Sequence, residues 1–121
     1  MSIDEVRAWF VGRGWGIAPA DQLFYERLAG VLEEGETPQL GMPITCDNAV
    51  GHAVLTDRRL VHIGTNLVTG MQVKAIPRAD IQGASFGGLV LGKVTVKHAG
   101  GVTTFKGGKP QAKQLMAALG Y

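Results

Sequence analysis

Four side chains in this sequence are nitrogen or sulfur ligands of the kind that bind zinc. They are His52, His62, His98 and Cys46. None of them stands at a spacing typical of zinc sites, such as two cysteines separated by two residues. A hairpin turn at Asp57 and Arg58 would place His52 and His62 opposite each other. A packed pair of this kind needs no metal ion, and we expect neither a metal site nor a cofactor.

Catalysis by a nucleophile or by paired carboxylates has little support. Cys46 precedes Asp47, whose negative charge would raise the pKa of the thiol. No Gly-x-Ser-x-Gly motif is present, and seven of the ten acidic residues precede residue 37. The Gly12–Gly16 segment resembles a phosphate-binding loop but lacks the Gly-Lys-Ser/Thr ending, so a helix end and turn is favoured. We expect no enzymatic activity and no small-molecule substrate.

Charge is distributed unevenly along the chain. Residues 1–57 carry three basic and nine acidic residues, a net charge of −6. Residues 58–121 carry nine basic residues and one acidic residue, a net charge of +8. Two interpretations stay open: a basic surface for an anionic partner, or an acidic segment that packs on the basic part within one chain or between subunits.

Two helices are predicted in the first 35 residues. The first spans Ser2–Val11 and begins with a Ser2–Glu5 capping box. The second spans Asp21–Glu34, begins at Pro19 or Asp21, and ends at Gly35. An apolar stripe on the second helix makes it a candidate interaction helix: Leu23, Phe24, Leu28 and Val31. This stripe fits either the core of the protein or a contact between subunits, and both alternatives stay open.

From residue 37 onward the pattern changes to that of short strands. We expect seven, at residues 37–46, 50–56, 59–64, 71–77, 80–86, 93–97 and 102–106. Pro38 and Pro43 favour an edge position for the first. Pro110 then begins an amphipathic helix with apolar residues at i, i+3, i+4 and i+7. The predicted fold class is mainly β with α: a seven-stranded antiparallel barrel or sandwich capped by a C-terminal helix.

The strongest strand alternation carries basic residues on its outer side. Lys93, Thr95 and Lys97 alternate with Val94 and Val96. With residues from neighbouring strands they form a predicted face for an anionic partner: Lys74, Arg78, Lys93, Lys97 and Lys106. Attraction to an anionic membrane is worth about 1 kcal/mol per basic residue. Nucleic acid is not expected as a partner, because only two phenylalanines lie nearby for base stacking.

Several ordered pieces resemble a known family. Gly51–Leu60, Ala75–Ile81, Leu91–Val96, and Phe105 with the closing helix are similar to bacterial pleckstrin-homology (PH)-like domains. The resemblance covers about residues 36–119. It implies a PH-like fold and a role in binding or assembly. We therefore expect a PH-like domain at 36–121, preceded by the N-terminal helical segment at 1–35, which the resemblance does not cover. It does not extend to inositol phosphate recognition, because the 45–49 loop has an acidic residue and no basic one, and it supplies no catalytic residues.

The compartment is indicated by cysteine usage. A single cysteine excludes an internal disulfide, no signal peptide is visible, and no apolar run approaches the roughly 20 residues of a membrane span. We therefore expect a cytoplasmic, non-enzymatic PH-like module. The predicted partner is another protein or a second copy, bound through the N-terminal helices and the basic face. The alternative is a peripheral membrane adaptor that binds anionic lipid through the basic strand face.

Overall fold

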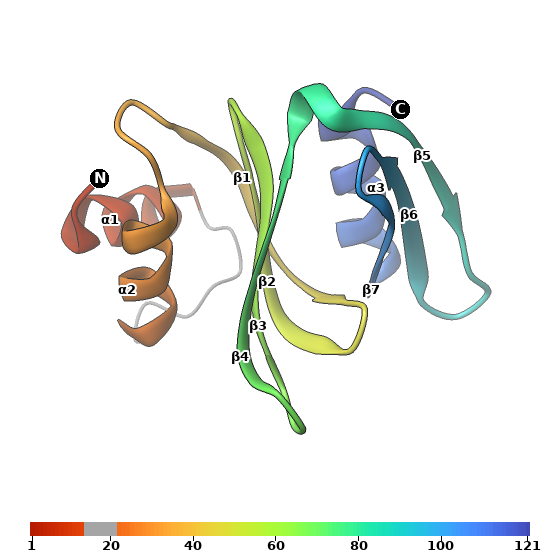
Figure 1. The fold of residues 1–121 in the computed structure, drawn as a ribbon, viewed down its shortest axis with the longest axis horizontal. Helices are drawn as coiled ribbons and strands as arrows, with labels where there is room; N and C mark the ends of the chain where they lie inside the picture. Colours follow the sequence, from red (N-terminus) through yellow and green to blue (C-terminus); the bar gives the residue numbers. More distant parts are fainter. Residues whose placement is uncertain (14–21) are drawn as a thin grey trace.

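The computed structural model describes residues 1–13 and 22–121, and Figure 1 shows the arrangement of their elements. In chain order the described elements are α1 (Ile3–Arg13), α2 (Gln22–Val31), β1 (Pro38–Cys46), β2 (Ala49–Thr56), β3 (Arg59–Asn66), β4 (Gly70–Pro77), the short 3-10 helix η1 (Arg78–Asp80), β5 (Ile81–Gly87), β6 (Gly92–His98), β7 (Gly101–Gly107) and α3 (Lys109–Leu119). Most of the Gly12–Gly16 loop and the predicted helix start at Pro19 or Asp21 lie outside the described residues.

All seven strands belong to one antiparallel sheet in the order β4-β3-β2-β1-β7-β6-β5. The prediction of seven antiparallel strands is confirmed. β1 and β7 pair only through Thr45 with Lys106 and Cys46 with Phe105. The sheet therefore bends at this short junction into a first half-sheet, β1–β4, and a second half-sheet, β5–β7 (Figure 1). β4 and β5 are the two edge strands.

The predicted edge position of β1 is wrong, because β1 is the central strand of the sheet. The signal from Pro38 and Pro43 nevertheless has a physical basis. Both prolines precede the two residues that pair with β7, so the side of β1 that faces away from β2 is without a strand partner there. A proline, which has no N–H to donate, is tolerated at such a position.

α3 packs on the inner side of the bend, as predicted (Figure 1). Its residues Ala112 and Leu115 are buried with Phe105, Val94 and other strand residues, and we call this cluster the first core. Pro110 stands at the beginning of the helix, and Gly120 ends it with a φ of 90°. Gly92 is required at this contact, since a Cβ there would collide with Ala112.

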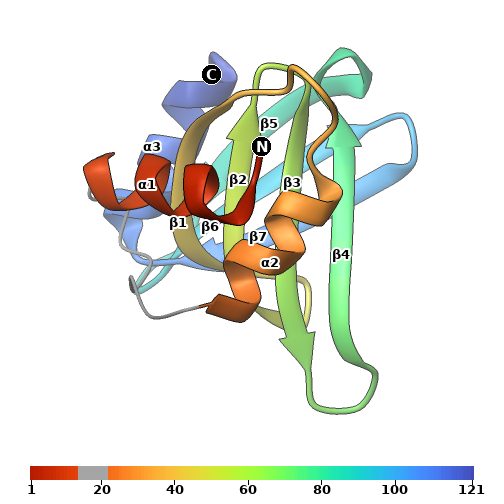
Figure 2. The same cartoon turned by 90° about the vertical axis from the view of Figure 1, so that its left-hand side faces the viewer.

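α1 and α2 cover the other side of the first half-sheet, where they lie across β1–β3 (Figure 2). The predicted capping box of α1 is present: the Glu5 N–H donates to Ser2 Oγ at 3.2 Å, and the Ser2 N–H donates to Glu5 Oε1 at 3.3 Å. A second core joins the helices to the sheet and consists of Val6, Phe10, Phe24, Tyr25, Leu28, Leu32, Val54, Val61 and Ile63. Within the described residues no helix has the length and apolarity to cross a bilayer.

Candidate functional site

Three of the five predicted basic residues share the outer face of the second half-sheet. Lys93 of β6 pairs directly with Lys106 of β7, and Lys97 pairs with Val102. Directly opposed residues of an antiparallel pair point to the same side of the sheet. All three lysines are exposed. We call this surface of β6 and β7, with Lys93, Lys97 and Lys106, the lysine face.

The alternation of β6 and β7 explains why the lysines point outward. Val94, Val96 and Phe105 point inward and are buried in the first core. On β5, the residues that pair with Lys93 and Lys97 are Gly87 and Gly83, and a Cβ at either would meet nothing within 4 Å. The β5 positions beside Lys93 and Lys97 therefore carry no side chain, and Ser85 between them is small, so a flat partner has access to the lysine face.

The lysine face differs in its ion pairing from Arg58 and Lys74. Within the described residues, Lys93, Lys97 and Lys106 form no ion pair, whereas Arg58 and Lys74 each have an acidic partner. Lys93 and Lys106 also oppose each other directly, and like charges in this arrangement destabilise a sheet. An anionic partner placed over the pair would relieve this repulsion.

The other two predicted basic residues lie elsewhere and serve the fold. Lys74 Nζ lies 3.3 Å from Asp47 Oδ2, so this lysine is tied to the β1–β2 turn. Arg78 Nη1 donates to Gln39 Oε1 at 2.7 Å and to the Thr56 carbonyl at 3.0 Å. The structure therefore separates Lys74 and Arg78 from the lysine face.

The candidate interaction helix lies against the chain's own sheet. Phe24 and Leu28 are buried in the second core, and Val31 is partly buried beside it. Leu23 is 50% exposed and lines a small groove of about 160 Å³ with Val50 and Met71. Of the four predicted residues, Leu23 is therefore the one that offers an exposed apolar side chain.

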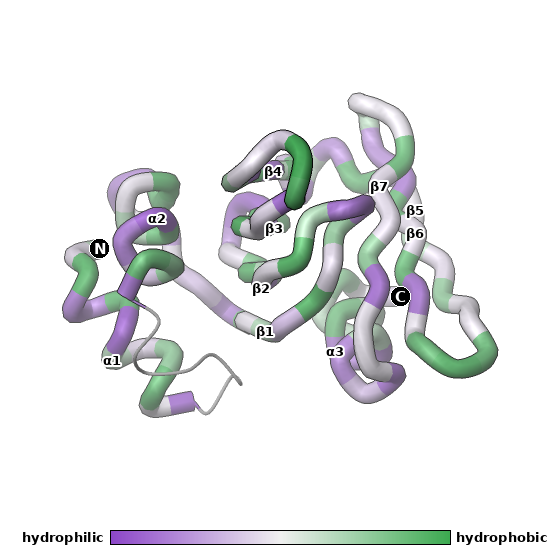
Figure 3. Tube along the Cα trace, turned by 90° about the horizontal axis from the view of Figure 1, so that it is seen from below, coloured by the Kyte–Doolittle hydropathy of each residue, from purple (hydrophilic) through white to green (hydrophobic). Residues whose placement is uncertain are grey.

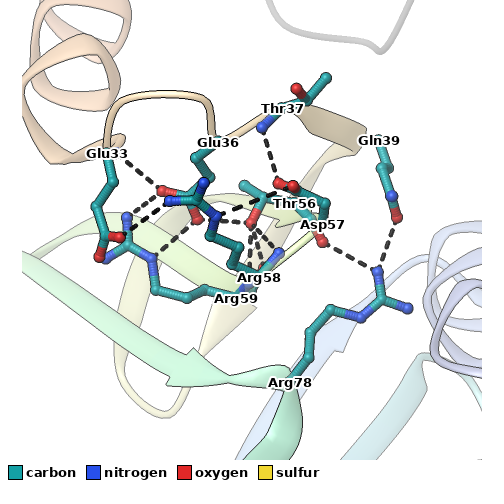
Figure 4. Close-up of polar contacts among 9 residues, drawn as sticks. All are labelled: Glu33, Glu36, Thr37, Gln39, Thr56, Asp57, Arg58, Arg59 and Arg78. Carbon is teal, nitrogen blue, oxygen red and sulfur yellow. Dashed lines mark hydrogen bonds and ion pairs between the residues drawn. The ribbon is translucent and has the colours of Figure 1, made fainter.

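A buried ion pair missing from the sequence analysis fastens the helices to the sheet (Figure 4). The Glu36 carboxylate is fully buried and is paired with Arg59. It also accepts hydrogen bonds from Thr56 Oγ1 at 2.6 Å and from the Glu33 N–H at 3.0 Å. Burial alone would raise the pKa of Glu36, but the hydrogen bonds from Arg59 and Thr56 outweigh it and hold the pKa at about 2.

The same cluster ends α2 earlier than predicted. Arg59 donates to the Val31 carbonyl at 2.8 Å, and the Glu36 carboxylate accepts a hydrogen bond from the Glu33 N–H. Gly35 follows with a φ of 77°. Because these groups replace helical hydrogen bonds, the helix ends at Val31 and not at Glu34.

The predicted juxtaposition of His52 and His62 is wrong. The register pairs His52 with Ile63 and Ala53 with His62, so the two rings lie on opposite sides of the sheet. The His52 ring packs on Phe24, while His62 is buried and lies 2.7 Å from the Ile44 carbonyl. The described residues contain no cluster of three metal-ligating side chains.

Cys46 is buried, and its environment opposes thiolate formation. Burial, with a smaller contribution from Asp47, raises the pKa of the thiol to about 11. The predicted direction of the Asp47 effect is thus confirmed, although burial is the larger cause. A thiol of this kind is a poor nucleophile.

The bent sheet and its closing helix resemble a known solved structure. A crystal structure of a pleckstrin homology domain from Shewanella amazonensis matches with a TM-score of 0.56 and 17% identity, over 80% of this chain and 95% of that chain. No known protein family and no curated protein matches the sequence. The chain therefore has a PH-like fold, and its function must be argued from its own residues.

Proposed function

We propose that this protein is a non-enzymatic binding module that holds an anionic partner on its lysine face. The observation that carries the proposal is the direct opposition of Lys93 and Lys106 on an open surface, with no acidic partner among the described residues. Such a pair costs stability in the isolated domain, and nothing in the packing requires it. A bound anionic group would offset that cost.

The surroundings of the lysines narrow the class of partner. The row of outward residues between the two lysine rows is Ser85, Thr95 and Thr104. Phe86 and Phe105 pair with Val94 and so lie on the inner side of the sheet. The outward residues of the lysine face thus include no aromatic ring for base stacking. This favours a membrane or an acidic protein surface over single-stranded nucleic acid as the partner.

A charge-matched pair of variants tests this proposal. Lys106→Thr and Arg27→Gln each remove one positive charge, but Arg27 is exposed on α2, at the opposite end of the molecule (Figure 1). Binding to phosphatidylserine vesicles and to poly-L-glutamate is measured over a salt series. We expect binding to at least one probe that weakens with salt, and a loss of about fivefold for Lys106→Thr alone, because each lysine contributes about 1 kcal/mol. Equal affinities for the two variants, or no binding to either probe, would refute the proposal.

Self-association is a second candidate function, and the edge strand β4 favours it. β4 is an edge strand of the sheet in the described residues, and Met71 and Val73, which point to the side that carries α2, are 36% and 46% exposed. Met71 lines the groove with Leu23, Val50 and Ile63, and Val73 pairs with Ile63, so these side chains form an apolar strip beside α2. Two copies could pair β4 with β4 around a two-fold axis, which would cover the strip and satisfy the edge hydrogen bonds.

Light scattering at rising concentration tests this second candidate. We expect a dimer that Val73→Lys abolishes. The control is Val102→Lys, which changes an equally apolar, 60% exposed residue on the outer side of β7. A monomer at every concentration, or equal behaviour of the two variants, would remove self-association as a function.

A further inference from the structure

The loop between β5 and β6 ends in three consecutive exposed apolar residues. Leu89 is 94% exposed, Val90 is 86% exposed and Leu91 is 58% exposed. Figure 3 shows this loop as a hydrophobic stretch at the margin of the molecule. Contiguous exposed apolar side chains of this kind mark a contact with a partner or a membrane. We call these three residues the apolar tip.

The tip is held in shape by the glycines on both sides of it. Gly88 has a φ of 101°, and a Cβ there would collide with the Leu91 carbonyl oxygen. Gly92 lies against the first turn of α3, where its Cβ would meet the Lys109 Cα at 3.1 Å. The loop therefore turns tightly at Gly88, and its other end lies against α3.

Positive charge surrounds the base of the tip. Lys93 follows it two residues later, Lys106 lies opposite Lys93, and Lys109 lies beside Gly92. All three are exposed, and none has an acidic partner within the described part of the chain. An apolar projection ringed by lysines matches the interface of an anionic bilayer, where hydrocarbon lies beneath a layer of negative headgroups.

We propose that the apolar tip inserts into the interface of an anionic lipid bilayer while Lys93, Lys106 and Lys109 contact the headgroups. This inference rests on the proposed role of the lysine face and names its partner as a membrane. Lysine side chains suit this geometry because their apolar stems lie along the hydrocarbon boundary while their ammonium groups stay at headgroup level.

The β3–β4 hairpin supplies an internal control. Its tip residues Leu67 and Val68 are also fully or almost fully exposed. The turn of this hairpin is also tight, and in it the Val68 N–H donates to Asn66 Oδ1 at 2.8 Å. The lysine of this hairpin, Lys74 in the middle of β4, is already paired with Asp47. This tip therefore has the apolar character without the ring of unpaired lysines.

The first experiment compares the two tips in the full chain. Co-sedimentation is measured with vesicles of phosphatidylcholine containing 30 mol% phosphatidylserine, and with pure phosphatidylcholine. We expect Leu89→Ser/Val90→Ser to weaken binding to the anionic vesicles by about tenfold or more, and Leu67→Ser/Val68→Ser by less than about twofold. A loss for the β5–β6 variant no larger than that of the control would overturn the inference.

The second experiment reads insertion directly. Cys46 is buried, so an environment-sensitive dye attaches selectively to an introduced cysteine. We expect dye at Val90→Cys to shift to the blue and brighten with anionic vesicles, and dye at Val68→Cys to stay unchanged. An unshifted dye at position 90 on vesicles that bind the protein would overturn the inference.

These outcomes separate the inference from the proposed function. If Lys106→Thr weakens vesicle binding while the tip variant does not, the lysine face stands and insertion is refuted. If the protein binds poly-L-glutamate through Lys106 but not anionic vesicles, the partner is an acidic protein surface, and the inference fails while the proposed function remains. If Lys106→Thr changes binding to neither probe, the proposed function itself is refuted.

Discussion

Replacing Lys106 by glutamate is expected to stabilise the fold while it weakens binding to anionic partners. Lys106 lies directly opposite Lys93, so the wild-type pair is repulsive and the variant pair is attractive. A directly opposed charged pair changes stability by about 0.2–1 kcal/mol in either sense, so the reversal amounts to about 1 kcal/mol. For a chain of this length that corresponds to a rise in Tm of about 4 °C.

Lys97→Glu is the matched control for this effect. It makes the same change of charge on the same face, but Lys97 lies opposite Val102 and has no directly opposed lysine. We expect its Tm to stay within about 1 °C of the wild type. Both variants should lose affinity for phosphatidylserine vesicles, because both place a negative charge on the lysine face.

The assay is thermal unfolding at low and high salt, combined with a double variant. Adding Lys93→Glu to Lys106→Glu restores like charges, so the Tm gained by the single variant should be lost again. The gain should also shrink in about 1 M salt, where charges on the surface are screened. A Tm of Lys106→Glu equal to or below that of the wild type at low salt would refute the argument that repulsion persists on this face.

Three further predictions concern the packing of the N-terminal helices and the buried thiol. Glu36→Gln should destabilise the fold by about 3 kcal/mol, because it leaves the Arg59 guanidinium without its buried partner. The pKa of Glu36 is lowered from 4.5 to about 2 in the folded state, so its contribution to the free energy of unfolding is complete above about pH 4.5 and is lost as the pH falls towards 2. Urea unfolding over pH 7 to 2.5 should therefore show a smaller acid-induced loss of stability for Glu36→Gln than for the wild type. Gly41→Ala should cost about 1–3 kcal/mol, since the new Cβ would collide with the Phe10 ring of α1, and a chemical denaturation curve matching the wild type would contradict this packing. Cys46 should react with a thiol reagent at pH 8 only on unfolding, and rapid labelling of the native protein would show that burial does not protect it.

The sequence pattern was informative where structure depends on neighbouring residues. The alternation of Lys93–Lys97 correctly placed the lysines outward, and the spacing of Ala112 and Leu115 correctly predicted the buried side of α3. The Ser2–Glu5 cap was likewise predicted from adjacent residues. In each case the period of the side chains determines which side of the element they occupy.

The features that were missed depend on residues far apart in the chain. Glu36 and Arg59 are 23 positions apart, and either alone resembles an ordinary surface charge. His52 and His62 were misplaced because a shift of one residue in the register moves a side chain to the other side of the sheet. From the sequence alone, the apolar stripe of α2 fits a subunit contact as well as the core of the protein, because the sheet residues that cover it are distant in the chain.

Some features of the candidate site have no strand or helix period. The apolar tip stands between the pair Gly87 and Gly88 and the single Gly92, between two predicted strands, and an exposed loop leaves no periodic signal. Lys109 comes close to the tip only because α3 packs against Gly92. The grouping of the tip with Lys93, Lys106 and Lys109 therefore follows from tertiary structure.

Amide NMR spectra of the full chain with anionic lipid nanodiscs test the central claim most directly. Line broadening confined to residues 87–97 and 102–109, with α1 and α2 unaffected, is the result that binding through the lysine face and the apolar tip predicts. Broadening concentrated on α1 and α2, or spectra unchanged by anionic nanodiscs at low salt, would contradict it.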